Sequence, residues 1–109
     1  MTKPIDILNS MPERFNPDGA GDWETAIQFH LSGDDGGSFK LEVKDGACIV
    51  GEGEVDDAKA TISMADATFV GINTGSMNPM TAFMTGKIKV KGNMGEIMKL
   101  NNPAIFKRG

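Results

Sequence analysis

Apolar and polar residues alternate along two neighbouring segments in the first half of the chain. Between residues 25 and 31 every second position is Thr, Ile, Phe or Leu, and residues 39–43 repeat this period of two with Phe, Leu and Val. A strand with one buried face shows this period. Residues 33–37 read Gly-Asp-Asp-Gly-Gly, a turn sequence that tolerates positive φ. The pattern therefore predicts an antiparallel hairpin.

Shorter apolar segments predict the remaining strands. A tight Asp-Gly turn leads into residues 47–50, and residues 60–64 form the next segment after the acidic loop 52–57. These segments extend the hairpin into a predicted meander of four strands. Residues 87–91 read Lys-Ile-Lys-Val-Lys, which predicts a fifth strand with its lysines on one face.

Helical spacing of apolar residues recurs in four places, with Pro or Asn near the start of each segment and Gly or Pro near its end in most of them. The resulting order is α-ββββ-αα-β-α. A meander that buries one face beneath helices is an α+β, two-layer fold. The predicted helices are residues 5–11, residues 66–74, the segment between Asn78 and Gly86, and the segment between Asn93 and Asn102 with Glu96 at N3.

Length and composition exclude several classes of protein. The 109 residues allow one domain spanning residues 1–109. No apolar run approaches the roughly 20 residues that span a bilayer, and the first ten residues lack the apolar stretch of a secretory signal, so we expect a soluble, cytoplasmic protein. A single Cys and a single His exclude an intramolecular disulfide and the usual zinc sites, and we expect no metal and no cofactor.

Charge is distributed unevenly along an acidic chain. The net charge of −4 argues against a nucleic-acid partner. Residues 87–109 reverse the sign, because they hold six basic residues and only Glu96 as an acid. Lysines on one face of a strand serve as a solvent face, protect a sheet edge or contact phosphate head groups. We expect a monomer or weak dimer, in which any transient membrane contact runs through Lys87, Lys89, Lys91, Lys99, Lys107 and Arg108.

His30 and Cys48 are the residues that would serve a small acyl-transfer enzyme. His30 falls on the polar side of a predicted strand, and the sequence reveals no partner that would position it as a base. Cys48 lies in a short apolar strand, where a buried thiol is unreactive. Both residues favour structural roles, so we do not expect an enzyme.

Methionine is concentrated in the second half of the chain. Six of the eight methionines fall within 35 residues, at Met64, Met77, Met80, Met84, Met94 and Met98. Such a set forms either a plain core or an adaptable apolar pocket, because unbranched thioethers rearrange around ligands of different shape. Spacing alone leaves both interpretations open.

A series of short motifs gives the second half a family resemblance. With these motifs the chain resembles the sterol carrier protein type 2 family of lipid-binding domains, densely over residues 60–100 and more weakly over residues 27–50. In order, the motifs are Thr61-Ile62-Ser63-Met64-Ala65-Asp66, Phe69, Asn73-Thr74-Gly75, Met77-Asn78-Pro79, Ala82-Phe83, the ten residues from Gly86 to Gly95, and Met98-Lys99-Leu100.

The resemblance implies a five-stranded, mostly antiparallel sheet covered on one face by helices, with an apolar tunnel between the layers. It also implies non-enzymatic intracellular binding and transfer of a fatty acid, fatty acyl-CoA, sterol or similar ligand. Carried over by position, the lipid-binding residues are Ile27, Phe29, Leu41 and Ile62 on the strands, and Phe69, Ile72, Met80, Phe83, Met84, Met94 and Met98 on the helices.

The chain departs from the family at several positions. Met80 and Thr85 stand where relatives often carry Gln, which makes the expected pocket more apolar. Residues 107–109 do not form the small-basic-leucine tripeptide of peroxisomal members. The alternative interpretation is an interaction or accessory module for a lipid-metabolising enzyme, with a vestigial cavity filled by its own side chains.

Overall fold

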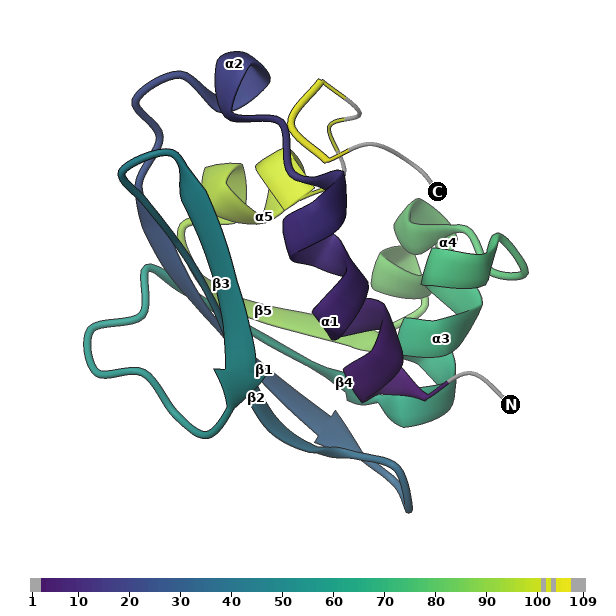
Figure 1. Cartoon of the computed structure of the whole chain (residues 1–109). Coiled ribbons are helices and arrows are strands. Elements are labelled where there is room, and N and C mark those ends of the chain that lie inside the picture. Colours follow the sequence, from purple (N-terminus) through teal and green to yellow (C-terminus); the bar gives the residue numbers. More distant parts are fainter. Residues whose placement is uncertain (1–2, 101, 103, 107–109) are drawn as a thin grey trace.

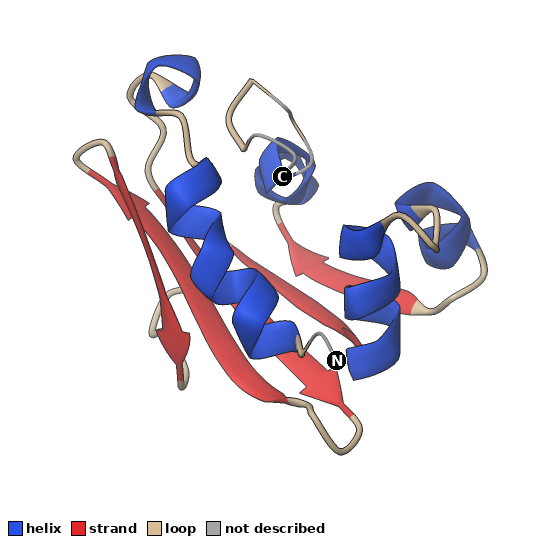
Figure 2. Cartoon of the chain, turned by 45° about the vertical axis from the view of Figure 1, so that its right-hand side comes forward, coloured by secondary structure: helices blue, strands red, loops and turns tan. Residues whose placement is uncertain are grey.

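The alternating segments form one five-stranded sheet, and the helices gather over one of its faces (Figure 1, Figure 2). The computed structural model describes residues 3–100, 102 and 104–106. We call the face beneath the helices the inner face and the opposite one the outer face. The strands are β1 (Thr25–Ser32), β2 (Gly37–Lys44), β3 (Ala47–Glu52), β4 (Ala60–Ala65) and β5 (Ile88–Gly92).

The strand order is β3-β2-β1-β4-β5. Strands β1 and β4 run parallel, and the other three neighbouring pairs are antiparallel. The α+β class, the first hairpin and the mostly antiparallel sheet are therefore confirmed. The predicted four-strand meander is wrong, because β4 pairs with β1 in the middle of the sheet and not with β3 at its edge.

Gln28 holds the crossover that brings β4 to β1. It lies between two inward-facing apolar residues of β1, so its side chain is on the outer face, yet only 4% of Gln28 is exposed. Its Nε2 donates to the carbonyls of Phe39 and Gly53 at 2.9 and 3.0 Å, and its Oε1 accepts from the N–H of Val55 at 2.7 Å. Residues 53–59 therefore cross the outer face over Gln28. The chain then enters β4 on the other side of β1.

The four predicted helices are present, together with a short additional one. They are α1 (Pro4–Arg14), α2 (Pro17–Ala20), α3 (Asp66–Thr74), α4 (Pro79–Met84) and α5 (Met94–Leu100). Helix α2 has only four residues and no apolar repeat, so the periodicity gives no sign of it. Among the described residues, none of the helices has both the length and the hydropathy to cross a lipid bilayer.

Local signals end and begin the helices where the sequence predicts. Gly75 follows α3 in the left-handed region, with φ of 86°, a conformation that glycine adopts without steric cost. Asn78 caps α4, because its Oδ1 accepts from the N–H groups of Met80 and Thr81 at 2.8 and 3.3 Å. The end of α3 and the start of α4 are therefore set by local residues.

The core lies between the inner face of the sheet and helices α1 and α3. Leu8 of α1, Ile27 of β1 and Leu41 of β2 are completely buried. Phe29 of β1 and Phe69 of α3 meet edge to face with ring centroids 5.8 Å apart. Each such side chain contributes roughly 1.5–3 kcal/mol through burial. These contacts attach both helices to the middle of the sheet.

Candidate functional site

A small apolar cavity of about 90 Å³ lies between the sheet and the helices. Strands β1, β4 and β5 contribute to it from the sheet, and helices α1, α3 and α5 and the first residue of α4 contribute from the other side. Its one polar side chain is Asn73, whose Nδ2 already donates to the carbonyl of Phe69 at 2.8 Å. The cavity therefore suits hydrocarbon. Its lining comprises Met11, Phe29, Ile62, Met64, Phe69, Ile72, Asn73, Pro79, Ile88, Ile97 and Leu100.

A wider cavity of about 540 Å³ adjoins the small one and involves α1 and the end of α3. Both cavities are lined by Met11, Ile72, Asn73, Pro79 and Leu100, so we treat them as one region, the main cavity. The wider part is more polar than the small part. The residues that line only the wider part are Ile7, Ser10, Glu13, Arg14, Thr74, Gly75 and Phe106.

Arg14, the last residue of α1, lines the wider part of the main cavity. Its Nε atom is buried and has no hydrogen-bond partner among the described residues. A buried polar group without a partner costs about 1–3 kcal/mol, and more when it is charged. An anionic oxygen supplies the acceptor that this donor lacks, in a charge-assisted hydrogen bond. The lining of the wider part holds one basic residue, Arg14, together with the acidic Glu13.

The strand and α3 residues expected to bind lipid divide into two groups. Phe29, Ile62, Phe69 and Ile72 line the small part of the main cavity, as expected for residues on the inner face and on α3. Ile27 and Leu41 also face inward, but both are completely buried in the core and line neither part.

The apolar residues expected on α4 and α5 lie on the surface. Helix α4 buries only Ala82, so its apolar stripe turns toward solvent. None of these residues lines the main cavity, and their contact with lipid stays a prediction. We call them the α4–α5 patch: Met80, Phe83, Met84, Met94 and Met98, with exposed fractions of 66%, 43%, 78%, 41% and 68%.

Sequence reasoning missed several residues of the main cavity. Ile97 and Leu100 stand three apart on α5, and Ile88 lies on the apolar side of β5, so helical spacing and strand alternation could have indicated them. Arg14 gave no such signal, because an arginine at the end of an amphipathic helix is normally solvated. Its role depends on the cavity around it.

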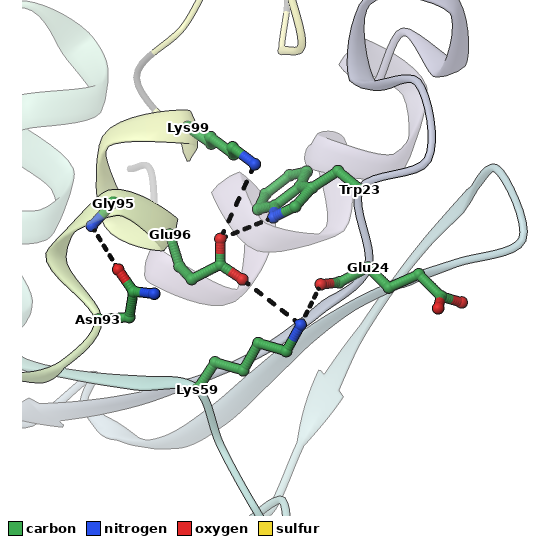
Figure 3. Close-up of polar contacts among 7 residues, drawn as sticks. All are labelled: Trp23, Glu24, Lys59, Asn93, Gly95, Glu96 and Lys99. Carbon is green, nitrogen blue, oxygen red and sulfur yellow. Dashed lines mark hydrogen bonds and ion pairs between the residues drawn. The ribbon is translucent and has the colours of Figure 1, made fainter.

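Glu96 fixes the rotation of α5 through polar contacts of its buried carboxylate (Figure 3). It stands at N3 as expected, but its carboxylate accepts from Trp23 Nε1 at 2.9 Å and is only 7% exposed as a residue. Lys59 and Lys99 place their Nζ atoms 3.7 and 4.0 Å from its oxygens. Lys59 also donates to the carbonyl of Glu24 at 2.7 Å. The buried charge is thus partnered, and α5 turns Ile97 and Leu100 toward the cavity.

His30 and Cys48 lie on opposite faces of the sheet. Cys48 is buried and pairs with Val43, an inward-facing core residue of β2. His30 is on the outer face, where its Nδ1 lies 3.2 Å from Ser38 Oγ. The two residues therefore do not form a nucleophile–base pair. Within the described part of the chain, no group of three or more His, Cys, Asp or Glu side chains is placed to hold a metal ion.

A family comparison covers nearly the whole chain. The sequence model of the SCP-2 sterol transfer family matches residues 8–104. Hydroxysteroid dehydrogenase-like protein 2 of Rattus norvegicus is 44% identical over 78 residues, which are 71% of this chain and 15% of that protein. Sterol carrier protein 2 of Homo sapiens is 46% identical in an alignment 82 residues long that covers 62% of this chain and 15% of that protein. The chain thus corresponds to a small part of these longer relatives.

A solved structure has the same fold. The solution structure of palmitated SCP2L2 from Aedes aegypti matches with a TM-score of 0.77 and covers 91% of each chain. The two sequences are 17% identical, so this likeness shows a shared arrangement of helices and strands.

Cys48 provides a test of burial beneath α1. Burial raises the pKa of its thiol from 9.0 to about 11, because the thiolate would lose its hydration. At pH 8 about one thiol in a thousand is then ionised, against about one in ten for a free thiol. We expect iodoacetamide to alkylate the folded protein at least roughly tenfold more slowly than the urea-unfolded protein. Equal rates would contradict the burial.

The same shift gives a stability change with a defined sign. Because the pKa of Cys48 is higher in the folded state, the protonated thiol favours folding below about pH 9. This contribution falls as the pH rises toward 11 and the unfolded state ionises first. The Cys48→Ala variant should lack that part of the alkaline loss of stability, which urea unfolding at several pH values measures.

Proposed function

Because the chain belongs to the SCP-2 sterol transfer family, we propose that it binds a single-chain lipid in the main cavity and carries it without covalent chemistry. The observation that carries this proposal is the polarity of the cavity, which is apolar next to the sheet and holds the buried Arg14 donor in its wider part. A fatty acid has the same arrangement, with hydrocarbon ending in a carboxylate. The shared fold of palmitated SCP2L2 supports this class of ligand.

The sizes of the two parts suggest how the chain of the lipid is held. The wider part, at about 540 Å³, lies within the range of roughly 300–1,000 Å³ typical of ligand sites. The small part, at about 90 Å³, is far below it and accepts only the end of a chain. Met11 lines both parts, and an unbranched thioether moves aside at low cost. Burial of hydrocarbon, at roughly 25 cal/mol per Å², then supplies most of the affinity.

Ile72 allows the position of the ligand to be tested. It lies on α3 and lines both parts, so Ile72→Trp should fill the region that they share. Palmitate at about 100 times its dissociation constant should stabilise the wild type by about 2.7 kcal/mol, and this gain should disappear in the variant. Thermal unfolding with and without palmitate measures both, and native mass spectrometry counts the bound lipid.

Met80→Trp separates this site from the one expected on α4. Met80 is 66% exposed and lines neither part, so its replacement should leave palmitate binding unchanged. Leu100→Trp, on α5, offers a second block if Ile72→Trp folds poorly. Loss of binding in Met80→Trp alone would place the lipid at α4. A wild type that binds no apolar ligand would favour the accessory-module interpretation.

Arg14 predicts selectivity for an anionic head group. A hydrogen bond to a charged group contributes about 1.5–3 kcal/mol, so Arg14→Gln should weaken palmitate binding by roughly 10- to 100-fold. Hexadecanol, which has the same chain and no charge, should bind both proteins equally. Glu13→Gln is the matched control, because Glu13 lines the same cavity and this substitution removes a charge of the opposite sign. If Arg14→Gln weakened the binding of palmitate and hexadecanol equally, Arg14 would act by packing alone and not by recognising the charge.

The segment that carries four of the five residues of the α4–α5 patch contains no acidic residue. Residues 67–95 contain Lys87, Lys89 and Lys91 and no Asp or Glu. These lysines lie on or next to β5, the edge strand that α4 packs against and that leads into α5 (Figure 2). Lys99 is already engaged by Glu96, and Lys107 and Arg108 lie outside the described residues.

We also propose that the α4–α5 patch, together with the lysines on the outward side of the edge strand β5, makes the transient contact with anionic membranes through which lipid is exchanged. Exposed Met and Phe side chains insert among acyl chains, and each nearby lysine adds about 1 kcal/mol of attraction to anionic head groups. Helices α4 and α5 also contribute Pro79, Ile97 and Leu100 to the main cavity. Contact at the patch therefore acts on the helices that border the ligand.

Flotation with vesicles tests this contact. The wild type should float with vesicles that contain about 30% phosphatidylserine in phosphatidylcholine, and added salt should dissociate it from them. The triple change Met80→Ser, Phe83→Ser and Met84→Ser should reduce the floated fraction several-fold. Ile49→Ser is the control, because Ile49 is 61% exposed on β3 at the opposite edge of the sheet. An equal loss in both proteins would contradict a contact at α4.

A further inference from the structure

The outer face of the sheet carries a shallow groove where β1 and β4 end. Its volume is about 540 Å³, and its lining includes His30, Ser38, Ser63, Lys87 and Lys89. The described helices lie over the opposite face (Figure 2). The main cavity lies beneath those helices, so the outer groove is a separate place in the fold, although its Lys87 and Lys89 also belong to the proposed membrane contact.

Strand register places four polar side chains of the outer groove in one row. Ser38 of β2 pairs with His30 of β1, His30 with Ser63 of β4, and Ser63 with Lys89 of β5. Neighbours in such a row lie about 5 Å apart at Cβ. His30, Ser38 and Ser63 are half-buried, and His30 is held by its contact with Ser38 at 3.2 Å. The row is therefore an ordered surface.

The outer groove is strongly cationic at the β5 end. Lys87 and Lys89 stand two residues apart, so their backbones are about 7 Å apart along the strand. No Asp or Glu lines the groove, and neither lysine forms an ion pair within the described residues. Two ammonium groups so close repel each other. An anion between them removes that repulsion.

The donors around Ser63 suit a tetrahedral oxyanion. Its hydroxyl forms no hydrogen bond within the part of the chain that the structure describes, and Lys89 lies beside it in the row. Two ammonium groups and a hydroxyl can each donate to a different oxygen of one phosphate. A planar carboxylate offers only two oxygens. Gly86 lines the same groove without a side chain, which leaves room for the anion.

We propose that the outer groove is a phosphate-binding site, with Ser63, Lys87 and Lys89 as donors and His30 as the wall opposite the lysines. The groove recognises a phosphate monoester or diester, and its lining among the described residues includes no Phe or Trp on which a nucleic-acid base would stack. Met64 lines both the groove and the small part of the main cavity, so a phosphate-bearing lipid held in the reverse direction to the fatty acid proposed above would bring its phosphate to the same donors.

Amide NMR titration of the full chain with inorganic phosphate, at constant ionic strength set by chloride, tests the site. Saturable shifts should centre on His30, Ser63 and Lys89. Ser63→Ala and Lys89→Gln should each weaken binding at least roughly tenfold, in line with the loss of a hydrogen bond to a charged group. Lys40→Gln removes the same charge from the outer face outside the groove, and it should change binding less than about twofold. An equal loss in Lys40→Gln and Lys89→Gln overturns the proposal.

A second titration, with lysophosphatidic acid below its micelle concentration, identifies the source of the phosphate. If the ligand is a lipid, lysophosphatidic acid binds at least tenfold more tightly than inorganic phosphate, and Ile72→Trp removes that gain. If the ligand is a small phosphate ester, the two bind alike. Absence of saturable shifts with both ligands overturns the site, whereas palmitate binding by the wild type tests the lipid-carrier function separately.

Discussion

The parallel pairing of β1 with β4 is the constraint on which the rest of the structure depends. Helix α3 starts at the residue after β4, and β5 pairs with β4, so the place of β4 decides where the second half of the chain lies. Beside β1, it brings Phe69 of α3 onto Phe29 and closes the small part of the main cavity. Beside β3, as a simple meander would have it, α3 would stand at the sheet edge, away from Phe29.

A single side chain on the outer face makes that pairing possible. Gln28 satisfies the carbonyl of Gly53 and the N–H of Val55, so the crossing loop leaves few backbone groups without partners. Each of these hydrogen bonds contributes about 0.5–1.5 kcal/mol net, and each costs more if it is lost inside the protein. A polar residue on the outer face thus determines the arrangement of apolar residues on the inner face.

Local features could be predicted from the sequence, and non-local ones could not. Alternation identified the strands, and Gly75 and Asn78 marked helix limits, because those signals depend on residues a few positions apart. The place of β4 depends on Gln28 meeting a loop 25 residues away, and in the sequence Gln28 is only one polar residue of an alternating strand. The family resemblance correctly implied a mostly antiparallel sheet. The alternation alone led to the incorrect prediction of a four-strand meander.

The methionines show the same limit in the candidate site. Their spacing on α4 and α5 predicts an apolar face but not the direction in which that face turns. Glu96 decides this for α5, because a carboxylate with partners on Trp23, Lys59 and Lys99 is stable inside, and removing it from them would leave a buried charge unpaired. Met94 and Met98 then remain outside. In the structure the methionines of α4 and α5 therefore face the surroundings, while the main cavity draws on Met11 and Met64 together with Ile72 and Leu100.

Two unfavourable features coexist in this small fold, and the proposed function would offset both. Arg14 keeps a buried donor without a partner, and the α4–α5 patch keeps large apolar side chains in water. Neither helps folding, and the core between α1, β1 and β2 must outweigh them. In the proposed function, a carboxylate at Arg14 and a lipid surface at the patch would each relieve one of these costs on binding. A cost carried in the free state would then contribute to affinity at that site, because the bound state lacks it.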